Sequence, residues 1–337
     1  MYVDVVESLS VTLAPSGRPL AAFANGTIAF TSKISGVPDI SVCLTTPAGK
    51  QMIGRMMELP VFHPCVRLAR WKESPGELSF IPPDGRCVLA GYGVDLMPAS
   101  DLSASSLRLP VSLDMRTGLG PTGSDFDVRL QINSKAFASG RPGLAGGGSQ
   151  PGTASSPQLQ EVTVLVPLPA DVRNLPDIRP SKGDANYNPG SHVLEWHIPT
   201  KLLSTTTRSF TLRCTILGPR AADDDDEGRD SDSAGFGFGF DYDEPYQITA
   251  PVDSKGAAGE GLDRDRERDD KRIQQNKILM PTSATVSFSV KGWLASGLRV
   301  ESMMLNLRKS KGIVDSVKPY KGVKYLTVSE KGVEIRC

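Results

Sequence analysis

Short segments in which apolar and polar residues alternate recur along this chain and constrain its fold more than any other feature. Residues 2–13, 126–132 and 210–216 alternate over most of their length, and residues 20–34 and 286–290 repeat the pattern. Successive side chains of a strand point to opposite faces, so a period of two predicts a half-buried strand. Hardly any window shows the 3.6-residue stripe of an amphipathic helix. Because Gly, Pro and Asn or Asp turns separate the segments, the sequence predicts an all-β fold assembled from sandwiches.

The length and composition of the chain are typical of a soluble globular protein. Its 337 residues suffice for one large domain or two ordinary ones, and 39% of them are hydrophobic and 23% charged. No apolar run is long enough for a membrane span, and no secretory signal opens the chain. The five cysteines are scattered, odd in number and free of Cys-x-x-Cys spacing. This usage favours reduced thiols in a cytosolic protein.

Three stretches lack the alternating pattern. Residues 140–158 are rich in Gly, Ser and Pro, residues 220–244 contain an acidic run, and residues 253–277 mix both charges. None of them offers enough apolar surface to offset the entropy lost on ordering. We therefore predict disordered loops at 140–158 and 220–277, with a solvated insertion favoured over a regulatory acidic tail. A short helix at 263–272 is an alternative for part of the mixed-charge run.

The segment 62–87 gathers residue types that could form a reactive or metal-binding site. A zinc site needs three or four ligands with short paired spacing, whereas Cys65 and Cys87 lie 22 residues apart with His63 as the one histidine near them. A proline separates His63 from Cys65, which argues against a Cys–His nucleophile pair. The Pro-Pro-Asp-Gly run at 82–85 favours a tight turn and predicts a hairpin across it. We expect no metal, no cofactor, no catalytic residue and no enzymatic activity.

The C-terminal part of the chain carries a local excess of positive charge. Between Arg299 and Lys331 the basic residues outnumber the acidic ones by five, although the whole chain has a formal net charge of zero. Such a stretch suits an anionic membrane surface, where each basic residue contributes about 1 kcal/mol. A basic face exposed to water is an equally good interpretation. Nucleic acid is not expected as a partner, because the stretch lacks the interleaved aromatic residues of an RNA-binding template.

Several separate motifs, in the right order, carry a family resemblance. They are GTIAFTSKISGVPDISV at 26–42, FHPCVRLARW at 62–71, LSFIPPDG at 78–85 and PYKGVKY at 319–325. Together they resemble the C-terminal, mu-homology domain of the medium (mu) chain of clathrin-associated adaptor complexes. The GVKY ending resembles the mu chain of the third adaptor complex, which serves traffic to the lysosome or vacuole. The family's N-terminal longin-type domain has no counterpart here, so we expect the chain to correspond to the C-terminal domain alone.

The resemblance implies an elongated all-β fold of two β-sandwich subdomains, the second inserted into the first. Subdomain A would comprise residues 1–123 and 292–337 and bind the cargo signal. The inserted subdomain B would comprise residues 124–291. The three stretches without alternation all fall within this insertion, in agreement with the implied map.

The resemblance also implies a function, which is to bind Tyr-x-x-Φ sorting signals, where Φ is bulky and apolar, in the cytosolic tails of membrane cargo. The implied tyrosine pocket consists of Tyr2, which stacks on the ring, Asp4, which accepts the hydroxyl hydrogen bond, and Lys324. The implied Φ pocket consists of Met1, Val3, Val300, Met303 and Val323, and Gly322, Val323 and Lys324 would supply the edge strand for the peptide backbone. Thr31 stands where some members have a lysine, and Gly322 replaces an aromatic residue of the plasma-membrane type, so the tyrosine pocket is expected to be less clamped.

Partners and location follow from the same resemblance. The implied partners are cargo tails, two large chains and a small sigma chain of an adaptor complex, and anionic membrane lipids. The implied location is the cytoplasm, at the cytosolic face of Golgi and endosomal membranes and on coated vesicles. The alternative to a cargo-binding module is a mu-homology scaffold, of coatomer or stonin-like type, that has lost tyrosine-signal binding. Asp4 and the Val323-Lys324 ending favour retention of binding.

Overall fold

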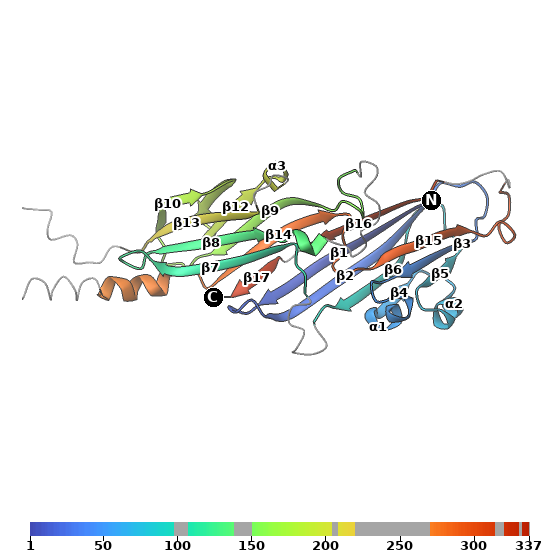
Figure 1. Cartoon of the computed structure of the whole chain (residues 1–337), viewed down its shortest axis with the longest axis horizontal. Helices are drawn as coiled ribbons and strands as arrows, with labels where there is room; N and C mark the ends of the chain where they lie inside the picture. Colours follow the sequence, from blue (N-terminus) through green and yellow to red (C-terminus); the bar gives the residue numbers. More distant parts are fainter. Residues whose placement is uncertain are drawn as a thin grey trace, which may run out of the picture.

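The structure is a computed structural model that describes residues 1–97, 107–137, 150–203, 208–219, 270–313, 320–329 and 332–336. The predicted loops at 140–149 and 220–269 therefore lie outside the described residues. Within the described residues strands dominate, and the predicted all-β class is confirmed. The molecule is elongated, with the chain's strands running along its length (Figure 1). No helix of the described part is long and apolar enough to cross a membrane.

A ten-stranded sheet runs through the whole molecule. Its strand order is β11-β12-β9-β14-β16-β1-β2-β6-β4, and β17 pairs with both β1 and β14. The strands are β1 (Tyr2–Leu13), β2 (Pro19–Ser32), β4 (Glu58–Phe62), β6 (Gly85–Asp95), β9 (Gln158–Pro167), β11 (Asp184–Asn188), β12 (Val193–Ile198), β14 (Ser283–Lys291), β16 (Gly322–Val328) and β17 (Val333–Arg336).

Two smaller sheets cover different parts of this long sheet. One contains β10 (Asn174–Pro180), β13 (Ser209–Leu217), β8 (Asp125–Ile132) and β7 (Val111–Leu119), and the other contains β15 (Arg299–Leu305), β3 (Ile40–Thr45) and β5 (Glu77–Phe80). Figure 1 shows the four-stranded sheet toward one end of the molecule and the three-stranded sheet toward the other. The helical segments are short: η1 (Lys50–Met52), α1 (Ile53–Met56), α2 (Leu68–Glu73), η3 (Ser134–Phe137), α3 (Thr200–Leu203) and residues 270–279.

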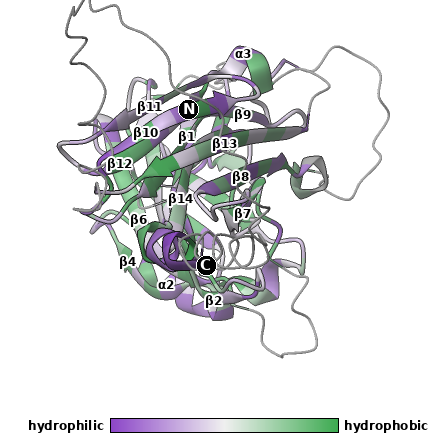
Figure 2. Ribbon diagram, turned by 90° about the vertical axis from the view of Figure 1, so that its left-hand side faces the viewer, coloured by the Kyte–Doolittle hydropathy of each residue, from purple (hydrophilic) through white to green (hydrophobic). Residues whose placement is uncertain are grey.

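Each of the two sandwiches has its own hydrophobic core. Phe126, Phe210 and Trp196 are fully buried in the core under the four-stranded sheet, and Phe30 and Phe80 meet edge to face at 5.1 Å between ring centroids in the core under the three-stranded sheet. Hydrophobic and hydrophilic colours alternate along the strands in Figure 2. The period of two in the sequence therefore builds both cores, as expected for strands with one buried face.

Strand β1 contributes to both cores through one face. Its first inward residues, including Val3 and Val5, belong to the core under the three-stranded sheet, whereas Leu9 and Val11 belong to the other core. Glu7 points inward between these two groups and is fully buried. The boundary between the sandwiches therefore crosses β1 at a buried carboxyl group.

The predicted subdomain boundary at residue 124 requires a correction. Strand β7 pairs with β8 and contributes Val111 and Leu113 to the core of the inserted sandwich. Residues 107–123, which we assigned to subdomain A, thus belong with subdomain B. The boundary came from the family resemblance, and no local pattern shows which sheet the strand at 111–119 joins.

The predicted hairpin across residues 82–85 is wrong. The turn is present, but β5 pairs with β3 in the three-stranded sheet and β6 pairs with β2 and β4 in the long sheet. The chain therefore crosses from one layer of the sandwich to the other at this turn. Turn residues predict a reversal of direction, and they do not determine which strand each flanking segment pairs with.

The predicted loops also extend too far at their ends. Residues 270–277 form most of a helix, and the end of this helix is fixed by Leu279, which is buried in the core, and by Asn276, whose side chain donates a 2.8 Å hydrogen bond to the carbonyl of Thr122. At the other loop, residues 150–157 form turns in which the Gly152 amide donates to the carbonyl of Ser156 at 2.8 Å. Tertiary contacts thus order segments whose own composition is that of a loop.

Candidate peptide-binding edge

The beginning of β16 is a strand edge without a neighbour on one side. On its other side, β16 pairs in parallel with β1, in register from Tyr2 with Gly322 to Ser8 with Val328. Strand β14 pairs with the opposite side of β16 only as far as Leu326, which lies across from Lys291, the last residue of β14. Within the described residues, the segment Gly322, Val323 and Lys324 therefore has an open edge, as an edge strand for a peptide requires.

The open edge presents the backbone groups of Val323. The Gly322 amide donates a 3.0 Å hydrogen bond to the carbonyl of Met1, so the backbone groups of Gly322 face β1. The carbonyl of Tyr325 accepts a 2.8 Å hydrogen bond from the Gly292 amide on the opposite side. Backbone groups alternate sides along a strand, so the N–H and C=O of Val323 face away from β1 and into the open edge.

The predicted tyrosine-pocket residues lie together on one face of the long sheet. Tyr2 is in register with Gly322 on one side and Thr31 on the other, and Asp4 is in register with Lys324. Asp4 is half-buried and Lys324 is exposed. No described residue forms an ion pair or hydrogen bond with the Asp4 carboxylate. This carboxylate is therefore available to accept a hydrogen bond from a bound hydroxyl group.

Two further residues contact Tyr2 that the sequence analysis missed. The ring centroids of Tyr320 and Tyr2 lie 5.8 Å apart, and the Lys33 ammonium lies 5.7 Å from the centroid of the Tyr2 ring. Gly322 makes room for this arrangement, because a Cβ atom there would lie 2.8 Å from Cδ1 of Tyr2. Tyr320 is within the motif quoted above, but its contact with Tyr2 depends on the parallel pairing of β16 with β1, which no local pattern reveals.

The predicted Φ-pocket residues lie on the other face, toward the three-stranded sheet. Val3, Met1 and Met303 are buried, and Val300 packs against the same core. Val323 is in register with Val3 but remains 37% exposed at the open edge. The structure thus brings together residues from β1, β15 and β16 as an apolar group beside the edge.

Tyr325 is a third residue that the sequence analysis did not assign to the site. Its hydroxyl oxygen accepts a 2.9 Å hydrogen bond from the Val300 amide, which joins the start of β15 to β16. Burial raises the pKa of this hydroxyl above its ordinary value, so the group stays protonated. Tyr325 therefore fixes the position of Val300 relative to the open edge.

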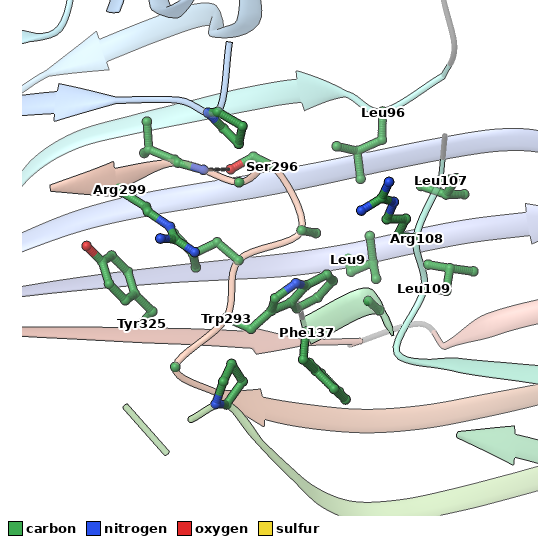
Figure 3. Close-up of a pocket in the computed structure, with 18 residues that line it drawn as sticks. Leu9, Leu96, Leu107, Arg108, Leu109, Phe137, Trp293, Ser296, Arg299 and Tyr325 are labelled. Carbon is green, nitrogen blue, oxygen red and sulfur yellow. Dashed lines mark hydrogen bonds between the residues drawn. The ribbon is translucent and has the colours of Figure 1, made fainter. Parts of the chain in front are cut away.

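A cavity next to Tyr325 is a feature separate from this edge. It is a cavity of about 320 Å³ at the junction of the two sandwiches, lined by Leu9, Leu109, Phe137, Trp293 and the segment 292–299 (Figure 3). Its lining includes Tyr325, which bonds to Val300, but none of the predicted Φ-pocket residues. A peptide that adds to a sheet edge needs pockets for alternate side chains rather than one enclosed cavity, so we base the site on the edge.

The cysteine and histidine segment has the geometry of packing residues. The Cys65 amide donates to Nδ1 of His63 at 3.2 Å, which is a local turn interaction. Burial raises the pKa of the Cys65 and Cys87 thiols above their ordinary values, which disfavours the reactive thiolate. In the part of the chain that the structure describes, no three His, Cys, Asp or Glu side chains are grouped as metal ligands would be.

Comparison with known proteins gives one family. A family model described as the adaptor complexes medium subunit family matches residues 1–337. AP-3 complex subunit mu-1 is 30% identical in Rattus norvegicus and 31% identical in Homo sapiens over 207 residues, which are 60% of this chain and 42% of each relative. The chain therefore spans less than half the length of these relatives.

Solved structures with the same fold are also found. A homology model of the full-length AP-3 complex in an intermediate open conformation matches with a TM-score of 0.57 and 20% identity, covering 100% of this chain and 68% of that chain. The yeast delta-COP-I mu-homology domain matches with a TM-score of 0.52 and 10% identity, covering 99% of this chain and 97% of that chain. At these identities the likeness establishes the mu-homology fold alone.

Proposed function

This chain belongs to the adaptor complexes medium subunit family, and from that premise we propose that it binds Tyr-x-x-Φ signals in the cytosolic tails of membrane cargo. The family is one of vesicle cargo adaptor subunits rather than enzymes, in agreement with the absence of a catalytic residue set in the sequence.

The observation that carries the proposal is the open edge at Val323 with different chemistry on its two faces. An extended peptide that pairs with this edge would continue the long sheet beyond β16 and take hydrogen bonds from the Val323 backbone. In an extended strand, residues three positions apart point to opposite faces. A signal with tyrosine at its first position and Φ at its fourth would therefore place its two specific side chains on opposite faces of the sheet.

The two faces of the edge match these two side chains. On one face the Asp4 carboxylate would accept the hydrogen bond of the tyrosine hydroxyl, with Lys324 beside it. On the other face the Φ side chain would meet Val3, Val323 and Met303, next to an existing apolar core. Burial of one large aliphatic side chain contributes about 1.5–3 kcal/mol. A small peptide interface of this kind suits a modest, transient affinity.

The partners and location proposed for the chain derive from its family and relatives. We propose that it acts within an adaptor complex with two large chains and a small sigma chain, at the cytosolic face of Golgi and endosomal membranes, in transport toward the lysosome or vacuole. Exposed basic residues of the C-terminal part, including Lys309, Lys311 and Lys324, would favour anionic lipids.

Calorimetric titration with three peptides tests the proposal. Tyr-x-x-Leu should bind, and Phe-x-x-Leu should bind about tenfold or more weakly because Asp4 then loses its hydrogen-bond partner. The phosphotyrosine peptide should not bind measurably, because about 1.5–2 negative charges would face Asp4. Asp4→Ala should remove the preference for tyrosine, and Asp184→Ala, an exposed aspartate on β11, is the matched control. Equal binding of all three peptides would contradict the proposal.

The alternative function is a mu-homology scaffold that does not read tyrosine signals. Two observations favour it: the Tyr320 ring contacts Tyr2 at the tyrosine face, and Thr31 lies opposite Tyr2 at a position where some family members have a lysine. A yeast delta-COP-I mu-homology domain of the same fold, with a TM-score of 0.51 to this chain, is described in complex with a Dsl1 WxWxV peptide. A WxWxV peptide therefore belongs in the same titration, and its binding without Tyr-x-x-Leu binding would favour the scaffold.

A further inference from the structure

The buried carboxyl group of Glu7 is the one fully buried acidic group in the described residues. It lies on β1, between the two hydrophobic cores, in a position where an apolar residue would continue both. A buried carboxyl group destabilises a fold unless its oxygen atoms are hydrogen-bonded. The three donors that satisfy it show which parts of the molecule it holds.

Two of the three donors come from one residue of the connector between β14 and β15, residues 292–298. The Ser296 amide donates a 3.0 Å hydrogen bond to Oε2 of Glu7, and the Ser296 hydroxyl donates to Oε1. The third donor is the Tyr92 hydroxyl on β6, at 2.9 Å from Oε1. The Tyr92 ring reaches Glu7 by lying over Gly26 of β2, where a Cβ atom would be 2.1 Å from the ring. Glu7 thus joins β1 to β6 on one side and to the connector on the other.

The connector leads directly into the strand that carries the Φ-pocket residues. The Ser296 hydroxyl oxygen accepts a 3.1 Å hydrogen bond from the Leu298 amide, and the Leu298 side chain is buried in the core. Two residues later, the Val300 amide donates to Tyr325 of β16. Figure 3 shows Ser296, Arg299 and Tyr325 along this path. The start of β15 is therefore anchored at two points, to Glu7 on β1 and to Tyr325 on β16.

We propose that Glu7 is a positioning residue for the Φ pocket, which it holds at a fixed distance from the open edge by anchoring Ser296. The proposal rests on the proposed function. Glu7 would not touch the peptide, because it lies further along β1 than Val3 and Val5 and its side chain is on the buried face of the strand. Its effect would reach the Φ side chain through Ser296, Leu298 and Val300, and it would leave the tyrosine face, formed by Tyr2 and Asp4, unchanged.

A pair of variants separates positioning from stability. Ser296→Ala and Tyr92→Phe each remove one hydroxyl donor from the same oxygen atom of Glu7. Only Ser296→Ala acts on the connector, where it also removes the acceptor of the Leu298 amide. Tyr92→Phe is therefore the matched control.

The first readout is the ratio of the affinities for Tyr-x-x-Leu and Tyr-x-x-Ala peptides. Ser296→Ala should lower this ratio by roughly two- to tenfold, the size expected for one hydrogen bond, and Tyr92→Phe should leave it unchanged. The ratio of affinities for Tyr-x-x-Leu and Phe-x-x-Leu should be the same in both variants and in the wild type. An unchanged Leu-to-Ala ratio in Ser296→Ala, or an equal drop in Tyr92→Phe, would overturn the proposal.

The second readout does not depend on peptide binding. Amide hydrogen exchange over residues 298–305 should be faster in Ser296→Ala than in Tyr92→Phe. If the wild type binds no Tyr-x-x-Leu peptide, the proposed function fails, and the pocket role of Glu7 fails with it. In that case, faster exchange in Ser296→Ala than in Tyr92→Phe would still support Glu7 as an anchor of β15. Equal exchange in the two variants would overturn that role as well. If Ser296→Ala does not fold, Ser296→Cys replaces it, because a thiol is a weaker hydrogen-bond donor than a hydroxyl. The affinity ratio and the exchange rate should then change in the same directions but by less.

Discussion

The two faces of the open edge differ in how firmly their residues are held. On the Φ face, Val3 and Met303 are buried in a core and Val300 is fixed by the Tyr325 hydroxyl. On the tyrosine face, Asp4 is half-buried with no bonded partner among the described residues, and Tyr320 is 73% exposed. The Φ face is thus built by the fold itself, whereas the tyrosine face is a set of side chains placed on a strand.

This difference indicates which substitutions should lower the stability of the domain and which should lower its affinity for a peptide. A buried residue of the Φ face such as Val3 belongs to a core, so its replacement should cost stability as well as the proposed peptide affinity. On the tyrosine face Asp4 is only half-buried, so its replacement should change the proposed peptide affinity and leave the fold intact.

The largest expected effect is that of Val3→Asp. Val3 is fully buried, and an unpaired carboxylate there would cost about 4 kcal/mol or more of unfolding free energy. The neighbouring Asp4→Ala should change the unfolding free energy by no more than about 0.5 kcal/mol. Urea denaturation of both variants measures the difference. Similar destabilisation by the two substitutions would contradict the contrast between the faces.

Val323→Asp should affect binding more than stability, because Val323 belongs to the Φ face but is 37% exposed. A carboxylate placed there would be desolvated against the incoming Φ side chain, so the affinity for Tyr-x-x-Leu should fall by about tenfold or more. Calorimetry measures the affinity, and circular dichroism checks that the variant is folded. A variant that is folded and binds with wild-type affinity would remove Val323 from the proposed site.

The stability of the domain should depend on pH through Glu7. Burial raises the pKa of the Glu7 carboxyl above its ordinary value. The unfolded chain releases this proton near the ordinary pKa, while the folded chain retains it to higher pH, so the unfolding free energy falls as pH rises between the two values. Tyr92 is the titratable group bonded to Glu7, and burial raises the pKa of its hydroxyl, so it stays protonated in this window.

Glu7→Gln isolates this contribution, since glutamine does not titrate. Over the pH range above the ordinary glutamate pKa of about 4.3, the unfolding free energy of the wild type should fall with rising pH relative to that of Glu7→Gln. Urea denaturation at several pH values within this range gives both curves. Parallel curves would show that the folded state does not hold the proton of Glu7 more tightly than the unfolded chain.

The smallest effect is expected from Gly322→Ala. The added Cβ atom would lie 2.8 Å from the Tyr2 ring, and this ring would have to move. Tyr2 is only half-buried, so the adjustment should change the affinity for Tyr-x-x-Leu by a few-fold and leave the Leu-to-Ala ratio at the Φ position unchanged. Paired titrations with the two peptides measure this. A change in the Leu-to-Ala ratio would show that the two faces are coupled.

The sequence predicts the parts of this molecule that depend on local pattern. Alternation over 2–13 and 126–132 predicts β1 and β8 together with their inward faces, because burial of one face imposes the period of two. Pairing over long distances is not predictable in this way. The turn at 82–85 looks like a hairpin although its flanking strands join different sheets, and β7 lies in the inserted sandwich.

The candidate site divides in the same way. Asp4 and Lys324, which the family resemblance names, lie in register on neighbouring strands, and their role in binding stays a prediction. Tyr320 contacts Tyr2, and Tyr325 bonds to Val300, across long distances in the chain. No local residue pattern predicts these contacts. The burial of Glu7 is not predictable from the sequence either, because an acidic residue in an alternating strand is ordinarily assigned to the exposed face.

The most direct test of the central claim is a crystal structure of this domain with a Tyr-x-x-Leu peptide. The peptide backbone should lie extended beside β16 and pair with the N–H and C=O of Val323. Its tyrosine hydroxyl should donate to Asp4, and its leucine should lie on the opposite face against Val3 and Met303. A peptide bound elsewhere, for example along β4 or in the junction cavity, would contradict the claim that the open edge of β16 reads the signal.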